Sequence, residues 1–126
     1  MKKKLFLLIL LVNTQANAAT NQLTITNHFN SELKFIVGKN PDVLPDLIPT
    51  FTLAPQEQIQ TKVVDIQKEA YIRSEDKKNN YTFWGVNVEN NQIKIRGYQS
   101  KGIAYSWTND SVTFCTPDEY KKKNAC

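Results

Sequence analysis

Residues 81–98 read YTFWGVNVENNQIKIRGY, and this stretch decides the fold. In both of its halves, large or β-branched side chains alternate with polar or small ones, which is the two-residue period of a half-buried strand. The halves are separated by Asn90-Asn91, a pair of residues that favours tight turns. The stretch therefore predicts two antiparallel strands, at residues 81–88 and 92–98.

The same pattern extends outward along the chain. Short runs rich in β-branched and aromatic residues, separated by polar breaks, fall at residues 23–29, 33–37, 51–53, 58–66, 70–74, 103–107 and 111–115. No segment of that region holds a helical stripe over three turns. About nine short strands predict an all-β protein, a small antiparallel β-sandwich, with a small β-barrel as the alternative. The pair Asn30-Ser31 is expected to join the first two strands as a tight hairpin.

The segment at residues 40–49 breaks the alternation. Proline recurs there at every fourth position, which argues against a central strand because proline donates no ladder hydrogen bond. The segment also carries four large aliphatic residues: Val43, Leu44, Leu47 and Ile48. These residues are expected either to cap the open end of the sandwich or to form an apolar interaction loop that docks a partner or dips into a membrane interface.

The N-terminus has the order of charge, apolar run and small residues that is typical of a bacterial signal peptide. Lys2-Lys3-Lys4 precedes the apolar run, and Ala16-Asn17-Ala18 supplies a cleavage site. We therefore expect residues 1–18 to be a leader, and residues 19–126 to be a single β-sandwich domain in the periplasm or outside the cell. The apolar run is too short to span a bilayer, so no transmembrane anchor is expected after cleavage.

Charge gives no support for nucleic-acid binding. The whole chain has 16 lysine and arginine residues against 12 aspartate and glutamate residues, but three of the lysines belong to the expected leader. The remainder is nearly neutral, whereas nucleic-acid binding needs a clustered positive face. We therefore expect no nucleic-acid partner.

The C-terminal region predicts a short helix held by a disulfide. Thr116 is a suitable N-cap, Pro117 suits the first helical position, and Glu119 can reach back to the cap. Cys115 precedes this helix and Cys126 follows it. Two cysteines in an exported chain are expected to pair, and a bridge here would pin the helix to the last strand. The alternative is that one or both thiols are reactive or link two chains.

The sequence offers little catalytic or metal chemistry. His28 is the only histidine, which excludes a multi-histidine metal site, and paired cysteines supply no nucleophile. The chain has no glycine-rich phosphate loop, nucleophile elbow or calcium loop. We therefore expect no metal, no cofactor and no enzymatic activity. A small carboxylate-dependent hydrolase stays open as an alternative, because two acids suffice for glycoside hydrolysis.

The candidate binding residues lie on the two strands within residues 81–98. Ile93 and Ile95 are expected to point inward, which leaves Lys94, Arg96 and Tyr98 outward. In the other strand, Trp84 shares one face with Val86 and Val88, Tyr81 and Phe83 share the other with Asn87, and one of these two faces is expected to meet solvent. The candidate binding residues are Tyr81, Phe83, Lys94, Arg96 and Tyr98. Flat apolar rings beside forked or charged donors suit a sugar ring, a lipid headgroup or a protein hot spot.

These surface features favour an exported, non-enzymatic binding module. We expect its aromatic and basic sheet face to engage an envelope or host component, and the ligand to be a protein, glycan or lipid. A membrane-active, lipid-binding protein that uses the loop from Pro41 to Pro49 is the second hypothesis, and the carboxylate-dependent hydrolase is the third. The sequence leaves the oligomeric state open.

Overall fold

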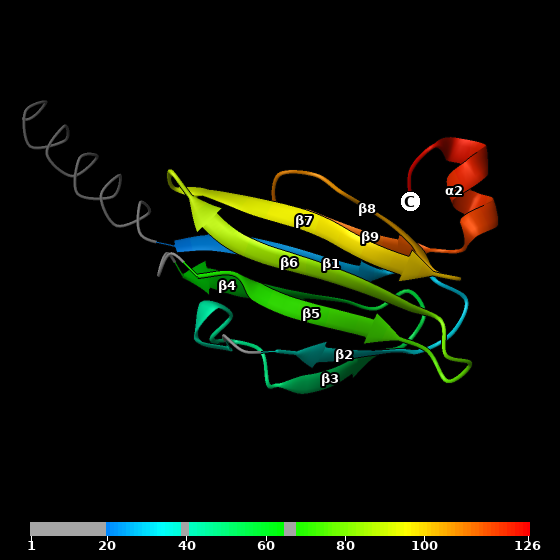
Figure 1. Ribbon diagram of the computed structural model, residues 1–126, viewed down its shortest axis with the longest axis horizontal. Coiled ribbons are helices and arrows are strands. Elements are labelled where there is room, and N and C mark those ends of the chain that lie inside the picture. Colours follow the sequence, from blue (N-terminus) through cyan, green and yellow to red (C-terminus); the bar gives the residue numbers. More distant parts are fainter. Residues whose placement is uncertain (1–19, 39–40, 65–67) are drawn as a thin grey trace, which may run out of the picture.

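The computed structural model describes residues 20–38, 41–64 and 68–126, and these residues form two stacked β-sheets (Figure 1). The four-stranded sheet has the order β4-β1-β9-β8 and consists of β1 (Thr20–Asn27), β4 (Gln58–Val64), β8 (Ala104–Trp107) and β9 (Ser111–Cys115). The five-stranded sheet has the order β3-β2-β5-β6-β7 and consists of β2 (Leu33–Val37), β3 (Thr50–Leu53), β5 (Ala70–Glu75), β6 (Tyr81–Glu89) and β7 (Gln92–Lys101). The protein is thus a β-sandwich, as predicted, and not the closed barrel that was the alternative.

The strand boundaries lie close to the predicted ones. Strands β6 and β7 begin at the predicted residues, and the turn between them uses Asn90 and Asn91 with φ of 53° and 63°. This left-handed conformation is one that asparagine tolerates. The strand predicted at residues 58–66 reaches Val64, and residues 65–67 lie outside the described residues. Residues 1–18 of the predicted leader also lie outside them.

The predicted hairpin at Asn30-Ser31 is wrong. Strand β1 pairs antiparallel with β4 and parallel with β9, whereas β2 pairs with β3 and β5 in the other sheet. The buried Asn27 side chain redirects the chain, because its Oδ1 accepts from the Phe29 N–H at 2.7 Å. Its Nδ2 donates to the carbonyls of Ser31 at 3.1 Å and of Leu53 at 2.9 Å. Asn27 therefore ties the crossing between the sheets to the end of β3.

The core lies between the sheets and is centred on Trp84, the largest fully buried side chain among the described residues. The indole N–H of Trp84 donates to the Ser74 hydroxyl at 3.0 Å, which satisfies its polar group. Its ring lies 5.9 Å from that of Phe114 in the opposite sheet, and Phe114 meets Phe35 at 5.4 Å. Because the inward side chains fill this layer, the alternate side chains of β5, β6 and β7 face outward.

The proline-rich segment begins with a 3-10 helix, η1 (Pro41–Val43), at the end of the sandwich opposite the C-terminal helix (Figure 1). Val43 and Leu44 are fully buried in the core, and Leu47 packs against it half-buried. Only Ile48 of the four aliphatic residues is largely exposed, at 63%. The segment therefore caps the sandwich. Val43 and Leu44, two of the four residues of the proposed interaction loop, are buried in the core and are not available to dock or insert.

The helix α2 (Pro117–Lys123) begins at the predicted residue. The Thr116 hydroxyl accepts from the Glu119 N–H at 3.2 Å, which caps its N-terminus. The predicted disulfide joins Cys115, the last residue of β9, to Cys126, with a Cα–Cα distance of 5.5 Å. Within the described ranges, no helix is long and apolar enough to cross a membrane.

Replacing Asn27 with alanine is expected to destabilise the fold by about 3 kcal/mol, because three backbone groups, two of them in buried hydrogen bonds, would lose their partner. Urea denaturation measures this change in the free energy of unfolding. The exposed Asn30→Ala variant is the control and should differ from the wild type by no more than about 0.5 kcal/mol. Equal stability of Asn27→Ala and wild type would contradict this role of Asn27.

Removing the disulfide in a Cys115→Ala, Cys126→Ser variant is expected to cost about 3 kcal/mol, since the bridge closes a short loop in the unfolded chain. A helix of seven residues is not stable alone, so α2 should also lose amide protection in hydrogen exchange. Reduction of the wild type with dithiothreitol should reproduce both effects. Unchanged protection of α2 in the reduced protein would show that packing alone holds the helix.

Candidate functional site

Three aromatic rings meet on the outer face of the five-stranded sheet, and we call them the aromatic cluster. They belong to Tyr71 on β5, Phe83 on β6 and Tyr98 on β7, which are neighbouring strands. Ring centroids lie 5.9 Å apart for Tyr71 and Phe83, 5.6 Å for Phe83 and Tyr98, and 6.0 Å for Tyr71 and Tyr98. Each ring therefore touches both others. The cluster is open to solvent, since Tyr98 is 44% exposed and the other two rings are half-buried.

A β-bulge places the third ring. Gly97 lies opposite Trp84 and Gln99 lies opposite Phe83, so Tyr98 is the extra residue of β7 at this point. A bulge bends its strand and re-aims a side chain, and such irregularities are common beside functional sites. Here the bulge brings the Tyr98 ring against Phe83.

A carboxylate lies beside the cluster. Glu69, just before β5, accepts a hydrogen bond from the Tyr98 hydroxyl at 2.8 Å. Its side chain runs over Gly85, where a Cβ atom would come within 2.6 Å of Glu69 Oε2 and 2.8 Å of its Cδ. Gly85 thus leaves the room that allows the carboxylate to lie flat on the sheet between strands.

The carboxylate also changes the titration of two phenols. The hydrogen bond with Glu69 raises the pKa of Tyr71 above its ordinary value of 10.0, and the negative charge of Glu69 adds to this. The same hydrogen bonding, followed by burial, raises the pKa of Tyr98. Both hydroxyls therefore stay protonated, and remain hydrogen-bond donors, at higher pH than an ordinary tyrosine hydroxyl does.

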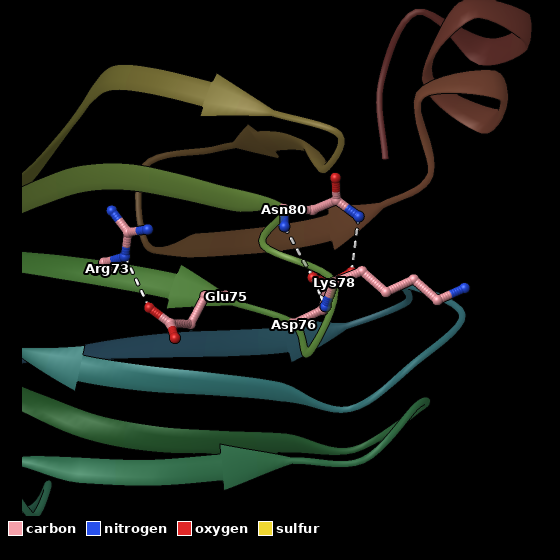
Figure 2. A network of polar contacts seen from close by, with 5 residues as sticks. All are labelled: Arg73, Glu75, Asp76, Lys78 and Asn80. Atoms are coloured by element: carbon pink, nitrogen blue, oxygen red, sulfur yellow. Dashed lines mark hydrogen bonds and ion pairs between the residues drawn. The ribbon is translucent and has the colours of Figure 1, made fainter.

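Two arginines flank the cluster, and each is paired with a glutamate. Arg73 Nε lies 2.7 Å from Glu75 Oε1 (Figure 2), and its guanidinium carbon lies 4.3 Å from the centre of the Tyr81 ring. Arg96 Nη2 lies 3.0 Å from Glu89 Oε1. These exposed pairs contribute little stability, but they hold planar donors beside the rings.

All five residues of the predicted binding face lie on the outer side of β6 and β7. Phe83 and Tyr98 come together in the cluster. Arg96 lies two residues before Tyr98 on β7, opposite Gly85 of β6. Tyr81 and Lys94 lie toward opposite ends of this face, and Lys94 is opposite Asn87. The centre of the face is less basic than predicted, because Glu69, Glu75 and Glu89 accompany the two arginines.

The prediction missed Tyr71, Arg73 and Glu69. A signal was present, because the run at residues 70–74 alternates and its inward positions are Ala70 and Ile72. That parity places Tyr71 and Arg73 outward. What the run alone does not reveal is that β5 pairs with β6, which brings these residues to the predicted face.

A second aromatic pair closes the side of the sandwich between β7 and β8. Tyr105 and Trp107 lie with ring centroids 5.5 Å apart, and both approach the backbone at Gly97. A Cβ atom at residue 97 would lie 2.9 Å from the Trp107 ring and would also meet the Tyr105 hydroxyl. Burial raises the pKa of Tyr105. This pair joins the edges of the two sheets, although the Trp107 ring remains partly exposed.

A cleft of about 910 Å³ opens near the N-terminus of α2, and Asp76 is one of its lining residues. Figure 2 shows that this carboxylate is engaged by its own turn, accepting from the Lys78 N–H and from the backbone and side-chain amides of Asn80 at 2.8 to 2.9 Å. Burial raises the pKa of Asp76, but these hydrogen bonds outweigh it and hold the pKa below the ordinary 3.8. Asp76 therefore stabilises the turn between β5 and β6.

The described residues hold no group of three histidine, cysteine, aspartate or glutamate side chains that could bind a metal ion. His28 lies exposed just after β1. The acids that could serve a carboxylate-dependent hydrolase are Asp65, Glu69, Glu75, Asp76, Glu89 and Asp110. Of these, Glu75 and Glu89 are paired with arginines. Asp65 lies outside the described residues.

Replacing Glu69 with glutamine is expected to lower the pKa of both Tyr71 and Tyr98 toward 10, because the carboxylate that stabilises the neutral phenols is gone. A raised phenol pKa stabilises the fold below about pH 10, and this contribution is lost as pH rises through the folded-state pKa. The variant should therefore lose less stability than the wild type in alkali. NMR titration of the tyrosine ring carbons measures the two pKa values.

Tyr105 is the internal control in this titration, because its raised pKa comes from burial and should not move in the variant. A shift of all three tyrosines together would indicate a general loosening of the fold. Unchanged titration of Tyr71 and Tyr98 would contradict the hydrogen bonding to Glu69.

Comparison of this chain with protein-family models finds no match, and a search of curated proteins finds none either. No family therefore indicates the function.

Proposed function

We propose that this protein is a non-enzymatic binding module that engages an envelope or host component through the outer face of β5, β6 and β7. The observation that carries this proposal is the aromatic cluster, in which three strands each contribute one ring to a single solvent-facing patch. Aromatic and arginine side chains are the residue types most enriched at binding hot spots.

The core of the sandwich does not require this cluster. The core between the sheets is filled by other side chains, with Trp84 and Phe114 at its centre. The outward face of a sheet is stable with small polar or charged residues, so three adjacent rings there are a cost in solubility unless a partner covers them. The rings are also held rigidly by mutual contact, which reduces the entropy lost on binding.

The expected export of the protein supports the choice of partner. The Cys115–Cys126 disulfide is of the kind that persists in oxidising compartments, which fits the leader expected at residues 1–18. A module in that location meets the cell envelope or, when released, the surface of a host. Neither the membrane-active nor the hydrolytic alternative gains a specific supporting observation, since Val43 and Leu44 lie in the core.

An affinity capture tests the proposal. The oxidised protein, immobilised as bait, is expected to retain a component of envelope extract or host-cell lysate, and an Arg96→Ala, Tyr98→Ala variant is expected to retain at least tenfold less. The two side chains are exposed, so the melting temperature should change by no more than about 3 °C.

The matched control removes an aromatic and a basic side chain elsewhere. A Tyr120→Ala, Lys121→Ala variant changes exposed residues of α2 and should capture as well as the wild type. Equal capture by the wild type and the folded Arg96→Ala, Tyr98→Ala variant would reject this face as the binding site. Loss of capture in both variants would reject it too, because the effect would not be specific to the face.

A further inference from the structure

We infer that the ligand of the aromatic cluster is a neutral sugar ring of a glycan. This inference rests on the proposed binding function and adds the chemical class of the ligand. It is drawn from the shape of the aromatic cluster, from the charge around it and from the polar groups at its rim.

The geometry of the cluster favours a ligand that stacks on one ring. Tyr71 and Phe83 are stacked on each other with an interplanar angle of 12°, so they cover part of each other's faces. Tyr98 is tilted by 43° against Phe83 and by 52° against Tyr71, and it is the most exposed ring of the cluster at 44%. Centroids no more than 6.0 Å apart leave no open centre between the rings. A caged cation would need rings that surround an open centre. The C–H face of a sugar ring, in contrast, packs on the negative face of an aromatic ring.

The charges favour a neutral ligand. Arg73 and Arg96 are each neutralised by a glutamate at 2.7 and 3.0 Å, and Glu69 adds a third carboxylate beside the rings. Lys94, further along β7, adds one positive charge, so three cations face three carboxylates and the face carries no net charge. Such a face gives an anionic ligand no net attraction, whereas a neutral ligand needs none and leaves both arginine–glutamate pairs in place.

The polar rim matches hydroxyl groups. A sugar hydroxyl both donates and accepts, so it needs acceptors and donors side by side. Glu69 Oε1 is an acceptor that already receives the Tyr98 hydroxyl, whereas Glu69 Oε2 is buried and does not reach solvent. Arg96 supplies the donors, and its partner Glu89 supplies a further acceptor. The sugar ring would thus stack on the cluster with its hydroxyls directed to this rim.

Two variants separate the rim from the rings. Gly85→Ala places a methyl group where the Glu69 side chain lies, so it displaces the carboxylate and leaves all three rings. Tyr98→Phe keeps the ring and removes the hydroxyl that donates to Glu69. Both replacements are small and compatible with a strand, and circular dichroism confirms folding before binding is measured.

The test is a panel of immobilised oligosaccharides that contains neutral, sialylated and sulfated glycans, followed by titration calorimetry with the glycans that bind. The wild type is expected to bind neutral glycans, with NMR shifts in the rings of Tyr71, Phe83 and Tyr98. Gly85→Ala and Tyr98→Phe are each expected to weaken binding about five- to tenfold. Tyr120→Ala on α2 should bind like the wild type.

Binding to charged glycans alone, or to choline in place of sugars, would overturn the inference. Binding of neutral glycans that is unchanged in both rim variants would overturn it as well. If no glycan binds while affinity capture still depends on Arg96 and Tyr98, the sugar inference fails and the proposed function stands. If capture is also independent of those residues, both fail.

Discussion

The burial of Trp84 between the two sheets determines where the neighbouring side chains of β6 lie. Its large ring fills the layer against Phe114 and its N–H is satisfied by Ser74, so the strand has one stable register. A slip by one residue would expose this ring and bury Phe83 in its place. The outward positions of Phe83 and Gly85 follow from that constraint. The candidate site therefore depends on a core residue that has no part in it.

The pairing registers of β5 and β7 with β6 then fix which residues of these strands lie beside Gly85. Tyr71 lies opposite Gly85 on β5, and Arg96 lies opposite Gly85 on β7. The missing side chain at Gly85 leaves space, and Glu69 occupies it. One glycine in β6 thus allows a carboxylate to lie beside the aromatic cluster. A Cβ atom at residue 85 would meet the Glu69 carboxylate.

Sequence reasoning succeeds where the pattern is local. Strand positions, the inward and outward faces of β6 and β7, the capped helix and the disulfide all follow from alternation, capping residues and cysteine count. It fails at Asn27, where the turn residues after β1 indicate a hairpin. The decisive hydrogen bond there joins Asn27 to Leu53, a contact between distant residues that leaves no mark in the local sequence.

Some residues of the candidate site can likewise be predicted from the local pattern, whereas others depend on contacts between distant parts of the chain. Alternation alone groups Tyr81 with Phe83 on one face of β6, and Lys94 with Arg96 and Tyr98 on one face of β7. That Tyr71 joins the outer face can be predicted only when the pairing of β5 with β6 is known. That the face is less basic than expected can be seen only from the ion pairs of Arg73 and Arg96 with glutamates.

The ion pairs of the two arginines change the chemistry of the outer face. A count of exposed basic residues suggests an anionic ligand, but each arginine here has its charge balanced by a glutamate on the same face. The guanidinium groups then act as oriented hydrogen-bond donors more than as sources of positive potential. Because the pairs are exposed, they contribute little to folding, whereas the inner face, centred on Trp84, preserves the sandwich.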